Sequence, residues 1–209
     1  MNVLIADDHE IVRRGLSEIL ADDFPKLCVV EACDGQQTLA AARKQTLDLI
    51  LLDIKLPGRS GLEILEELKK LQPKTPVVIV SAFPEEEYAL RAFRVGAAAY
   101  VSKEGASDEL LAAVRKALGG GRYVTPTLAE KMAAALSGEA PATPHEILSN
   151  RELEVLRLIA AGKTIKEIAA ELHLSEKTIG TYRLRVSKKM NLSTNVELTR
   201  YALQHRLAD

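Results

Sequence analysis

The chain of 209 residues has no tryptophan, only two cysteines and 4% aromatic residues. Two thiols are too few for a disulfide framework, and no zinc-ligand spacing involves Cys28, Cys33, His9, His145, His173 or His205. No apolar run reaches the roughly 18 residues that a membrane span needs, and the N-terminus lacks the basic and apolar segments of a signal peptide. We therefore expect a soluble, cytoplasmic protein without a membrane partner.

Net charge is also nearly absent, since 28 Lys and Arg residues stand against 29 Asp and Glu. This balance, with 47% apolar residues, excludes a mainly disordered chain. The total hides an asymmetry. Residues 1–119 hold 15 basic and 19 acidic residues, a net of −4, whereas residues 144–209 hold 11 and 8, a net of +3. At roughly 100 to 200 residues per domain, we expect two small domains, of which the basic one meets a polyanion.

Residues 1–119 alternate short apolar runs with longer stretches of helical period. Continuous apolar runs indicate strands buried on both faces, as in a parallel sheet covered by helices. The pattern predicts a doubly wound α/β domain of five βα units, (βα)5, with the five-stranded order 2-1-3-4-5. The predicted strands span 3–6, 27–32, 49–52, 77–80 and 99–101, and the predicted helices span 11–20, 36–44, 62–71, 85–95 and 108–118.

Glycines and prolines then mark residues 120–143 as a linker, with one short helix over 128–136. Residues 144–209 carry the start signals of helices. Capping boxes begin at Ser149, Thr164 and Thr194, and Ser175 caps a further helix that ends near Met190. Gly162 stands where the first of these helices should end. Four short helices with links of a few residues predict a small all-α bundle of the helix-turn-helix kind.

Polar residues follow the predicted strands of the first domain. Asp7 and Asp8 come directly after the first strand, Asp53 after the third and Ser81 after the fourth, and Lys103 lies two residues past the fifth. Because parallel strands end at one edge of a sheet, we expect these side chains to meet there.

Clustered carboxylates repel one another, and a hard divalent cation such as Mg²⁺ resolves this with oxygen ligands. A lysine and a hydroxyl beside the cation can hold phosphoryl oxygens. Asp53 is then a candidate nucleophile that forms an aspartyl phosphate. Taken singly, an Asp at a strand end is more often a helix cap, and a lone lysine is usually solvated.

The segments LIADDHEIVRRGL, LILLDIKLPGRSGLEIL, VIVSAF and GAAAYVSKEG resemble the signature blocks of response-regulator receiver domains, over about the first 118 residues. Asp53, Pro57 and Gly61 match the spacing of the family's phosphoacceptor segment. The resemblance implies that Asp53 is phosphorylated and that Asp8 and Asp53 bind Mg²⁺ directly. Asp7 would act through water, and the backbone carbonyl of Lys55 would complete the protein ligands.

The same resemblance gives three further residues a role. Ser81 is expected as the switch hydroxyl, Tyr100 as the switch aromatic residue and Lys103 as the phosphate-binding lysine. Apart from phosphorylation and dephosphorylation at Asp53, the resemblance implies no enzymatic activity.

In the third helix of the basic domain, Ile179, Tyr182, Val186 and Met190 recur at spacings of three and four and predict a buried stripe. Residues 177–189 contain five basic residues and no acidic one. A basic helix of this kind suits insertion into the DNA major groove, and the alternative is a solvated basic surface.

The segment LSNRELEVLRLIAAGKTIKEIAAELHLSEKTIGTYRLRVSKKMNL resembles the LuxR/NarL type of helix-turn-helix domain, from about Pro144 to the C-terminus. The resemblance implies base contacts from Gly180, Thr181 and Leu184. It implies backbone contacts from Lys177, Thr178, Arg183, Arg185 and Lys188. Gly180 departs from the larger polar residue often found in the family, and this shifts base reading toward Thr181, Leu184 and Arg185. The last helix has surplus apolar surface, which either forms a dimer contact or packs in the core.

The two resemblances together imply a two-component response regulator of the NarL/FixJ type. A sensor histidine kinase would phosphorylate Asp53, and the activated chain would dimerise on two DNA half-sites about one helical turn apart. Two alternatives stay open. The receiver could serve only as a dimerisation module of a phosphorylation-independent DNA-binding protein, or the Mg²⁺ pocket could hydrolyse small phosphates. Against the second, no further acidic residue lies beside Asp53 as a general acid.

Overall fold

The computed structural model describes residues 1–105, 107–137, 143–205 and 207–208. The chain divides into two compact units, Met1–Ser137 and Gly138–Asp209, and each is described separately below. Part of the predicted linker, 138–142, and residues 206 and 209 of the predicted helical domain lie outside the described residues.

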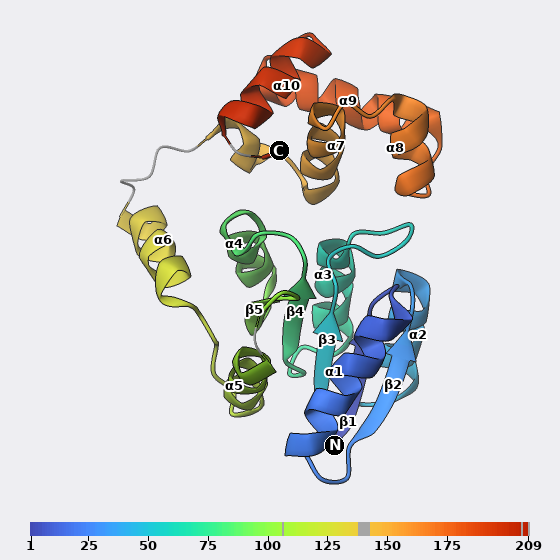
Figure 1. Ribbon diagram of the computed structural model, residues 1–209, viewed down its shortest axis with the longest axis vertical. Helices are drawn as coiled ribbons and strands as arrows, with labels where there is room; N and C mark the ends of the chain where they lie inside the picture. The colour runs from blue at the N-terminus through green and yellow to red at the C-terminus, as the bar shows by residue number, and fades with distance from the viewer. Residues whose placement is uncertain (106, 138–142, 206, 209) are drawn as a thin grey trace. The chain divides into compact units, whose positions relative to one another are not determined.

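The first unit alternates strands and helices and then adds one further helix (Figure 1). Its elements are β1 Asn2–Ala6, α1 Glu10–Asp23, β2 Cys28–Ala32, α2 Gly35–Lys44, β3 Leu49–Leu52, α3 Gly61–Leu71, β4 Val77–Ser81, α4 Glu85–Val95, β5 Ala99–Ser102, α5 Ser107–Leu118 and α6 Pro126–Ser137. The five predicted strands and helices of the (βα)5 pattern lie within a few residues of these bounds.

The sheet is parallel and has the order β2-β1-β3-β4-β5, which confirms the predicted topology. The register matters for function, because Ala6 is paired with Leu52 at the ends of β1 and β3, and Ser81 with Ser102 at the ends of β4 and β5. Residues that follow these strands therefore start from the same edge of the sheet.

The central strands are buried on both faces, as their continuous apolar sequences predict. All residues of β3 and β4 are buried, and four of the five residues of β1. Helices α1 and α5 contact each other on one face, where their apolar side chains pack on β1, β3, β4 and β5. Helices α2, α3 and α4 form a row of neighbours on the other face (Figure 1). The sheet thus holds its carboxyl edge rigidly between two layers of helices.

The stretch that was predicted to be a linker contains a well-packed helix. Helix α6 covers the predicted short helix 128–136 but belongs to the first unit, where it contacts α4 and buries Leu128. The division between the two compact units falls after Ser137, within the predicted linker of residues 120–143. Composition alone did not show the packing of α6, because the contact depends on α4, which lies some thirty residues earlier.

The second unit contains a short 3₁₀ helix and four α-helices: η1 Pro144–Ile147, α7 Asn150–Ala160, α8 Ile165–Glu171, α9 Glu176–Met190 and α10 Asn195–Gln204. The predicted capping boxes of Ser149, Thr164 and Thr194 are present, and Ser175 accepts a hydrogen bond from the amide of Thr178. Gly162 follows α7 with φ of 79°, a left-handed conformation that glycine adopts without strain. These caps mark the starts of four short helices.

Helix α7 is the centre of this unit, since it contacts α8, α9 and α10. Leu153, Leu156 and Ile159 on α7 are buried together with Ile179 and Val186 of α9. The arrangement confirms a helix-turn-helix unit in which α8 and α9 are the paired helices. None of the helices in the described part of the chain has the length and apolarity that a membrane crossing needs.

Candidate functional site

Two buried carboxylates lie side by side at the carboxyl edge of the sheet. Asp7 and Asp53 each follow a residue of the Ala6–Leu52 pair, and the amide of Asp53 donates to the carbonyl of Ala6 at 2.8 Å. Asp7 is 1% exposed and Asp53 is 3% exposed. Two like charges that are both out of water need a positive partner close by.

Lys103 supplies that partner. Its ammonium nitrogen Nζ lies 2.6 Å from Oδ2 of Asp7 and 2.7 Å from Oδ2 of Asp53. The amide of Lys103 donates to the carbonyl of Ser81 at 2.9 Å, which fixes the lysine backbone one residue past the Ser81–Ser102 pair. The structure therefore brings together the aspartates and the lysine that the sequence placed about fifty residues apart.

Burial and charge act in opposite directions on these groups. Burial raises the pKa of the Asp53 carboxyl, and attraction to the Lys103 ammonium offsets only part of that rise. Burial alone would lower the pKa of Lys103, but attraction to Asp53 and Asp7 outweighs it and raises the pKa. Lys103 thus stays charged, and its charge only partly offsets the burial of Asp53.

Asp8 and His9 extend the acidic cluster toward solvent. The His9 ring nitrogen Nδ1 lies 2.7 Å from Oδ1 of Asp8 and 3.3 Å from Oδ1 of Asp7. Ligand atoms of Asp7, Asp8 and His9 all lie within 4.8 Å of one another. No metal role was predicted for His9. Its position directly after the two aspartates was the signal that could have indicated this contact.

The loop after Asp53 is closed by short-range contacts. The amide of Lys55 donates to Oδ1 of Asp53 at 3.2 Å, and Lys55 forms an isolated antiparallel bridge with Ser60. A side chain at Gly61 would overlap the carbonyl oxygen of Asp53, so this position requires glycine. The glycine at position 61 thus has a steric reason: the chain must return closely past Asp53 before α3 begins.

A second set of contacts leads from the pocket edge to α4. The hydroxyl of Ser81 is buried and accepts a hydrogen bond from the amide of Phe83 at 3.2 Å. The hydroxyl of Tyr100 donates to the carbonyl of Phe83 at 2.8 Å. The rings of Phe83 and Tyr88 stack with centroids 4.9 Å apart. The two predicted switch residues, Ser81 and Tyr100, therefore both hold the loop between β4 and α4.

The second unit presents the predicted polar face of α9. Ile179, Val186 and Met190 are buried and Tyr182 is half-buried, which matches the predicted stripe. Of the residues predicted to contact DNA, Thr178 and Arg183 are half-buried, and the exposed ones are Lys177, Gly180, Thr181, Leu184, Arg185 and Lys188. Leu184 is 66% exposed.

The basic residues of α9 differ in what they contact. Lys189 Nζ lies 2.6 Å from Oε2 of the buried Glu152 on α7 and 3.3 Å from the carbonyl of Ile147. Arg183 Nε donates to Oδ1 of Asn195 at 2.7 Å. Lys189 was one of the five basic residues counted in this segment, but the structure uses it to fasten α9 to α7.

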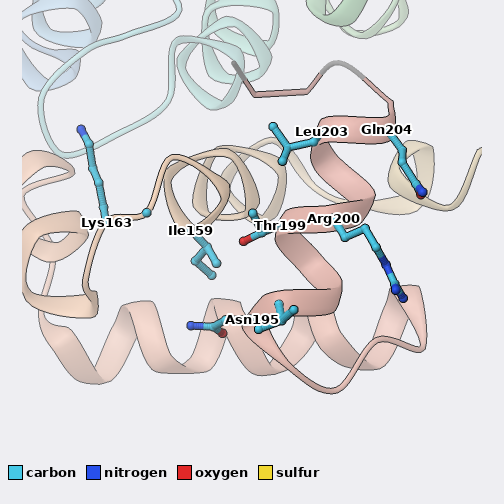
Figure 2. A pocket seen from close by; sticks show the side chains of 9 residues that line it. Ile159, Lys163, Asn195, Thr199, Arg200, Leu203 and Gln204 are labelled. Atoms are coloured by element: carbon cyan, nitrogen blue, oxygen red, sulfur yellow. The ribbon is translucent and has the colours of Figure 1, made fainter.

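Helix α10 divides its apolar residues between core and surface. Leu198 and Ala202 are buried, whereas Val196 is 77% exposed and Leu203 is 49% exposed. The exposed pair borders an open groove of about 560 Å³ between α10 and the end of α7, which Ile159 also lines (Figure 2). Core packing therefore accounts for only part of the apolar surface of this helix.

Comparison with known proteins matches both units. Residues 3–115 match the response regulator receiver domain family, and residues 146–202 match the luxR family of bacterial regulatory proteins. The chain is a response regulator. Its family is one of DNA-binding regulators rather than enzymes that turn over a substrate.

Curated relatives match this chain over nearly their whole length. The response regulators GacA of Pseudomonas aeruginosa and UvrY of Escherichia coli K12 are each 34% identical to this chain over 210 residues. These alignments cover all of this response regulator and 98% and 96% of the relatives.

Among solved structures, RcsB from Salmonella enterica serovar Typhimurium, bound to promoter rprA in the presence of the phosphomimetic BeF₃⁻, is 27% identical. It has a TM-score of 0.64 and covers 96% of this chain and 98% of its own. A LuxR-family response regulator from Aurantimonas sp. SI85-9A1 is 31% identical with a TM-score of 0.58, covering 65% of this chain and 97% of its own.

Proposed function

We propose that this response regulator binds promoter DNA under the control of Mg²⁺-dependent phosphorylation of Asp53 by a sensor histidine kinase. The observation that carries the proposal is the pair of contacts from Lys103 to Asp53 and Asp7 in a buried carboxylate pocket. Residues spread over nearly a hundred positions meet there, and their chemistry fits a phosphoryl group.

The transfer follows from the groups present. A carboxylate oxygen of Asp53 attacks the phosphorus of a phosphohistidine, the new P–O bond forms, the P–N bond breaks, and the departing imidazole takes a proton from solvent. Lys103 can then leave Asp53 and hold a phosphoryl oxygen by a charge-assisted hydrogen bond. Hydrolysis of the acyl phosphate by water restores Asp53, so the signal decays.

A divalent cation fits the remaining charge of the pocket. The carboxylates of Asp7 and Asp53 share one ammonium group and that of Asp8 lies close to Asp7, which leaves excess negative charge at a cluster of oxygen ligands. In this proposal Asp8, Asp53 and the Lys55 carbonyl hold Mg²⁺ directly and Asp7 acts through water. The ion would neutralise the negative charge of the incoming phosphoryl oxygens.

In this proposal the loop between β4 and α4 changes conformation when Asp53 is phosphorylated. The hydroxyl of Ser81 accepts a hydrogen bond from the amide of Phe83, and it would turn away from this amide to donate its proton to a phosphoryl oxygen. The side chain of Tyr100, which donates to the carbonyl of Phe83 in the same loop, would then change its position.

The exposed face of α9 suits the DNA major groove. Thr181, Leu184 and Arg185 reach base edges in this proposal, and the exposed lysines Lys177 and Lys188 contact phosphates. A response regulator of similar fold has been solved on promoter DNA, which supports this use of the unit. Val196 and Leu203 of α10 would form a homodimer contact, so that two copies read two half-sites.

Intact mass after incubation with Mg²⁺ and acetyl phosphate tests the pocket chemistry. We expect one added phosphoryl group on the wild-type chain and none on Asp53→Ala. If the wild-type chain with bound Mg²⁺ gains no phosphoryl group, the phosphorylation-independent alternative replaces this proposal, and the receiver is then a dimerisation module. Sustained turnover of a small phosphate ester would instead support the hydrolase alternative.

A further inference from the structure

The segment after α5 returns to the sheet and is held there. The amide of Tyr123 donates to the carbonyl of Ala98, just before β5, at 2.9 Å. The half-buried Tyr123 side chain packs against the apolar core under α1 and α5. The chain then enters α6, whose Leu128 is 2% exposed and which contacts α4. Helix α6 is therefore a packed part of the first unit.

The hydroxyl of Thr125 makes two hydrogen bonds at the start of α6. Its oxygen accepts from the amide of Leu128 at 3.2 Å, and its proton is donated to Oε2 of Glu85 at 2.8 Å. The first bond caps α6, and the second joins α6 to the first residue of α4. A single side chain thus takes part both in capping α6 and in joining it to α4.

Glu85 is close to the groups that respond to Asp53. Only three residues separate it from Ser81, and one of them, Phe83, is held by Ser81, Tyr100 and Tyr88. If Ser81 turns toward a phosphoryl oxygen, Phe83 loses its hydrogen-bond acceptor and the loop must move. Glu85, at the end of that loop, then loses its fixed position relative to Thr125.

We propose that the α4 surface is a docking site for this chain's own α6 and that the Thr125–Glu85 hydrogen bond is a latch that opens on phosphorylation. The proposal rests on the proposed function at Asp53. Helix α6 is the last element of the first unit, so its release frees the point from which the second unit departs. Phosphorylation in the pocket would thus affect the DNA-binding unit through the release of α6, the element that connects the two units.

Three variants separate the latch from the helix cap. Thr125→Asp keeps a strong capping residue but places a second carboxylate against Glu85, so the latch breaks while the cap remains. Thr125→Ser keeps both hydrogen bonds. Thr127→Asp adds the same charge two residues away at an exposed position of α6 and is the matched control.

Amide hydrogen exchange of α6 in the full chain measures the docking. We expect exchange to rise about tenfold on phosphorylation of the wild-type chain, in line with loss of one charge-assisted hydrogen bond. Unphosphorylated Thr125→Asp should already show that rise, whereas Thr125→Ser and Thr127→Asp should match the wild type. Thr125→Asp should also narrow the difference in DNA affinity between the unphosphorylated and phosphorylated forms.

The outcomes are separable. If mass confirms phosphorylation but α6 exchange does not change, the latch is wrong and the proposed function stands. If Thr125→Asp releases α6 but leaves the difference in DNA affinity unchanged, α6 does not carry the signal. If no phosphoryl group is added, the proposed function fails, and Thr125→Asp against Thr127→Asp still decides whether the latch holds α6.

Discussion

The two charged regions of this response regulator use charge in opposite ways. In the pocket, Asp7, Asp53 and Lys103 are largely withdrawn from water and contact one another directly. On α9, Lys177 and Lys188 are exposed and their charge faces solvent. Buried charges act as one unit, because removing one leaves the others uncompensated, whereas exposed charges act singly and are screened by salt.

This difference in burial predicts how substitutions in each region affect the protein. Substitutions in the pocket should strongly slow the phosphorylation of Asp53. Substitutions on α9 should change the affinity for DNA in small steps that depend on ionic strength. Lys189 tests the rule inside one helix, since it sits beside Lys188 in sequence but is tied to the buried Glu152.

The largest effect is expected at Lys103. Lys103→Met removes the ammonium that contacts both carboxylates, so the rate of phosphorylation by acetyl phosphate should fall by about 100-fold, as when one transition-state donor is lost. Time courses of intact mass measure this rate. Lys44→Met, at an exposed lysine of α2, should leave the rate unchanged, and an equal loss there would mean that general charge rather than the pocket sets the rate.

A smaller effect is expected where α9 meets α7. Glu152→Gln removes the charge that accepts from Lys189 and from the amide of Ser149, and should lower the free energy of unfolding of the second unit by about 2 kcal/mol at neutral pH. Urea titration, followed by NMR signals of this unit in the full chain, measures the change. A wild-type free energy of unfolding equal to that of the variant would show that the ion pair adds nothing.

The same pair gives a pH dependence. Burial alone would raise the pKa of Glu152, but its bonds to Lys189 and Ser149 outweigh burial and hold the pKa below the ordinary value of 4.5. A carboxyl with a lowered folded pKa adds stability above its unfolded pKa and loses it as pH falls through the folded one. The stability difference between wild type and Glu152→Gln should therefore shrink as pH drops below about 4.5.

The adjacent lysines of α9 should separate in DNA binding. Lys188→Gln should weaken binding and reduce the slope of log affinity against log salt by about 0.9, the value for one phosphate contact. Lys189→Gln should leave the slope unchanged while it destabilises the unit. Anisotropy titrations at several salt concentrations measure both slopes. Equal loss of slope in the two variants would place Lys189 on the DNA.

The smallest effect concerns Gly180. A methyl group at this position would meet no other atom of the described chain within 4 Å, so Gly180→Ala should stabilise α9 by about 1 kcal/mol through helix propensity. We expect DNA affinity to fall at the same time, because the methyl group occupies space against the DNA. A stabilised variant with unchanged DNA affinity would show that α9 does not approach the DNA closely at Gly180.

The sequence predicted the architecture well because the buried strands are continuous apolar runs and the helix starts carry capping residues. Strand order then followed from general rules for parallel sheets, and the meeting of Asp7, Asp53 and Lys103 followed from strand order. For this part of the molecule, residue type and position along the chain were sufficient.

Other features depend on packing between distant segments and could not be predicted in this way. Lys188 and Lys189 are neighbouring residues of the same type, so the sequence does not distinguish their roles. Only the position of α7, whose Glu152 pairs with Lys189, does so. The docking of α6 depends on a contact between Thr125 and Glu85, forty residues apart, and a stretch rich in Gly, Pro and Ala gave no sign of it.

The central claim is that phosphorylation of Asp53 controls DNA binding. Its most direct test is the DNA affinity of the full chain before and after treatment with acetyl phosphate and Mg²⁺, for wild type and Asp53→Asn. The duplex would be selected from a random library on the treated wild-type chain. The account predicts that phosphorylated wild type binds this DNA at least about tenfold more tightly, the scale of an ordinary allosteric coupling, and that Asp53→Asn does not respond. Equal affinity of the two forms, with phosphorylation confirmed by mass, would contradict it.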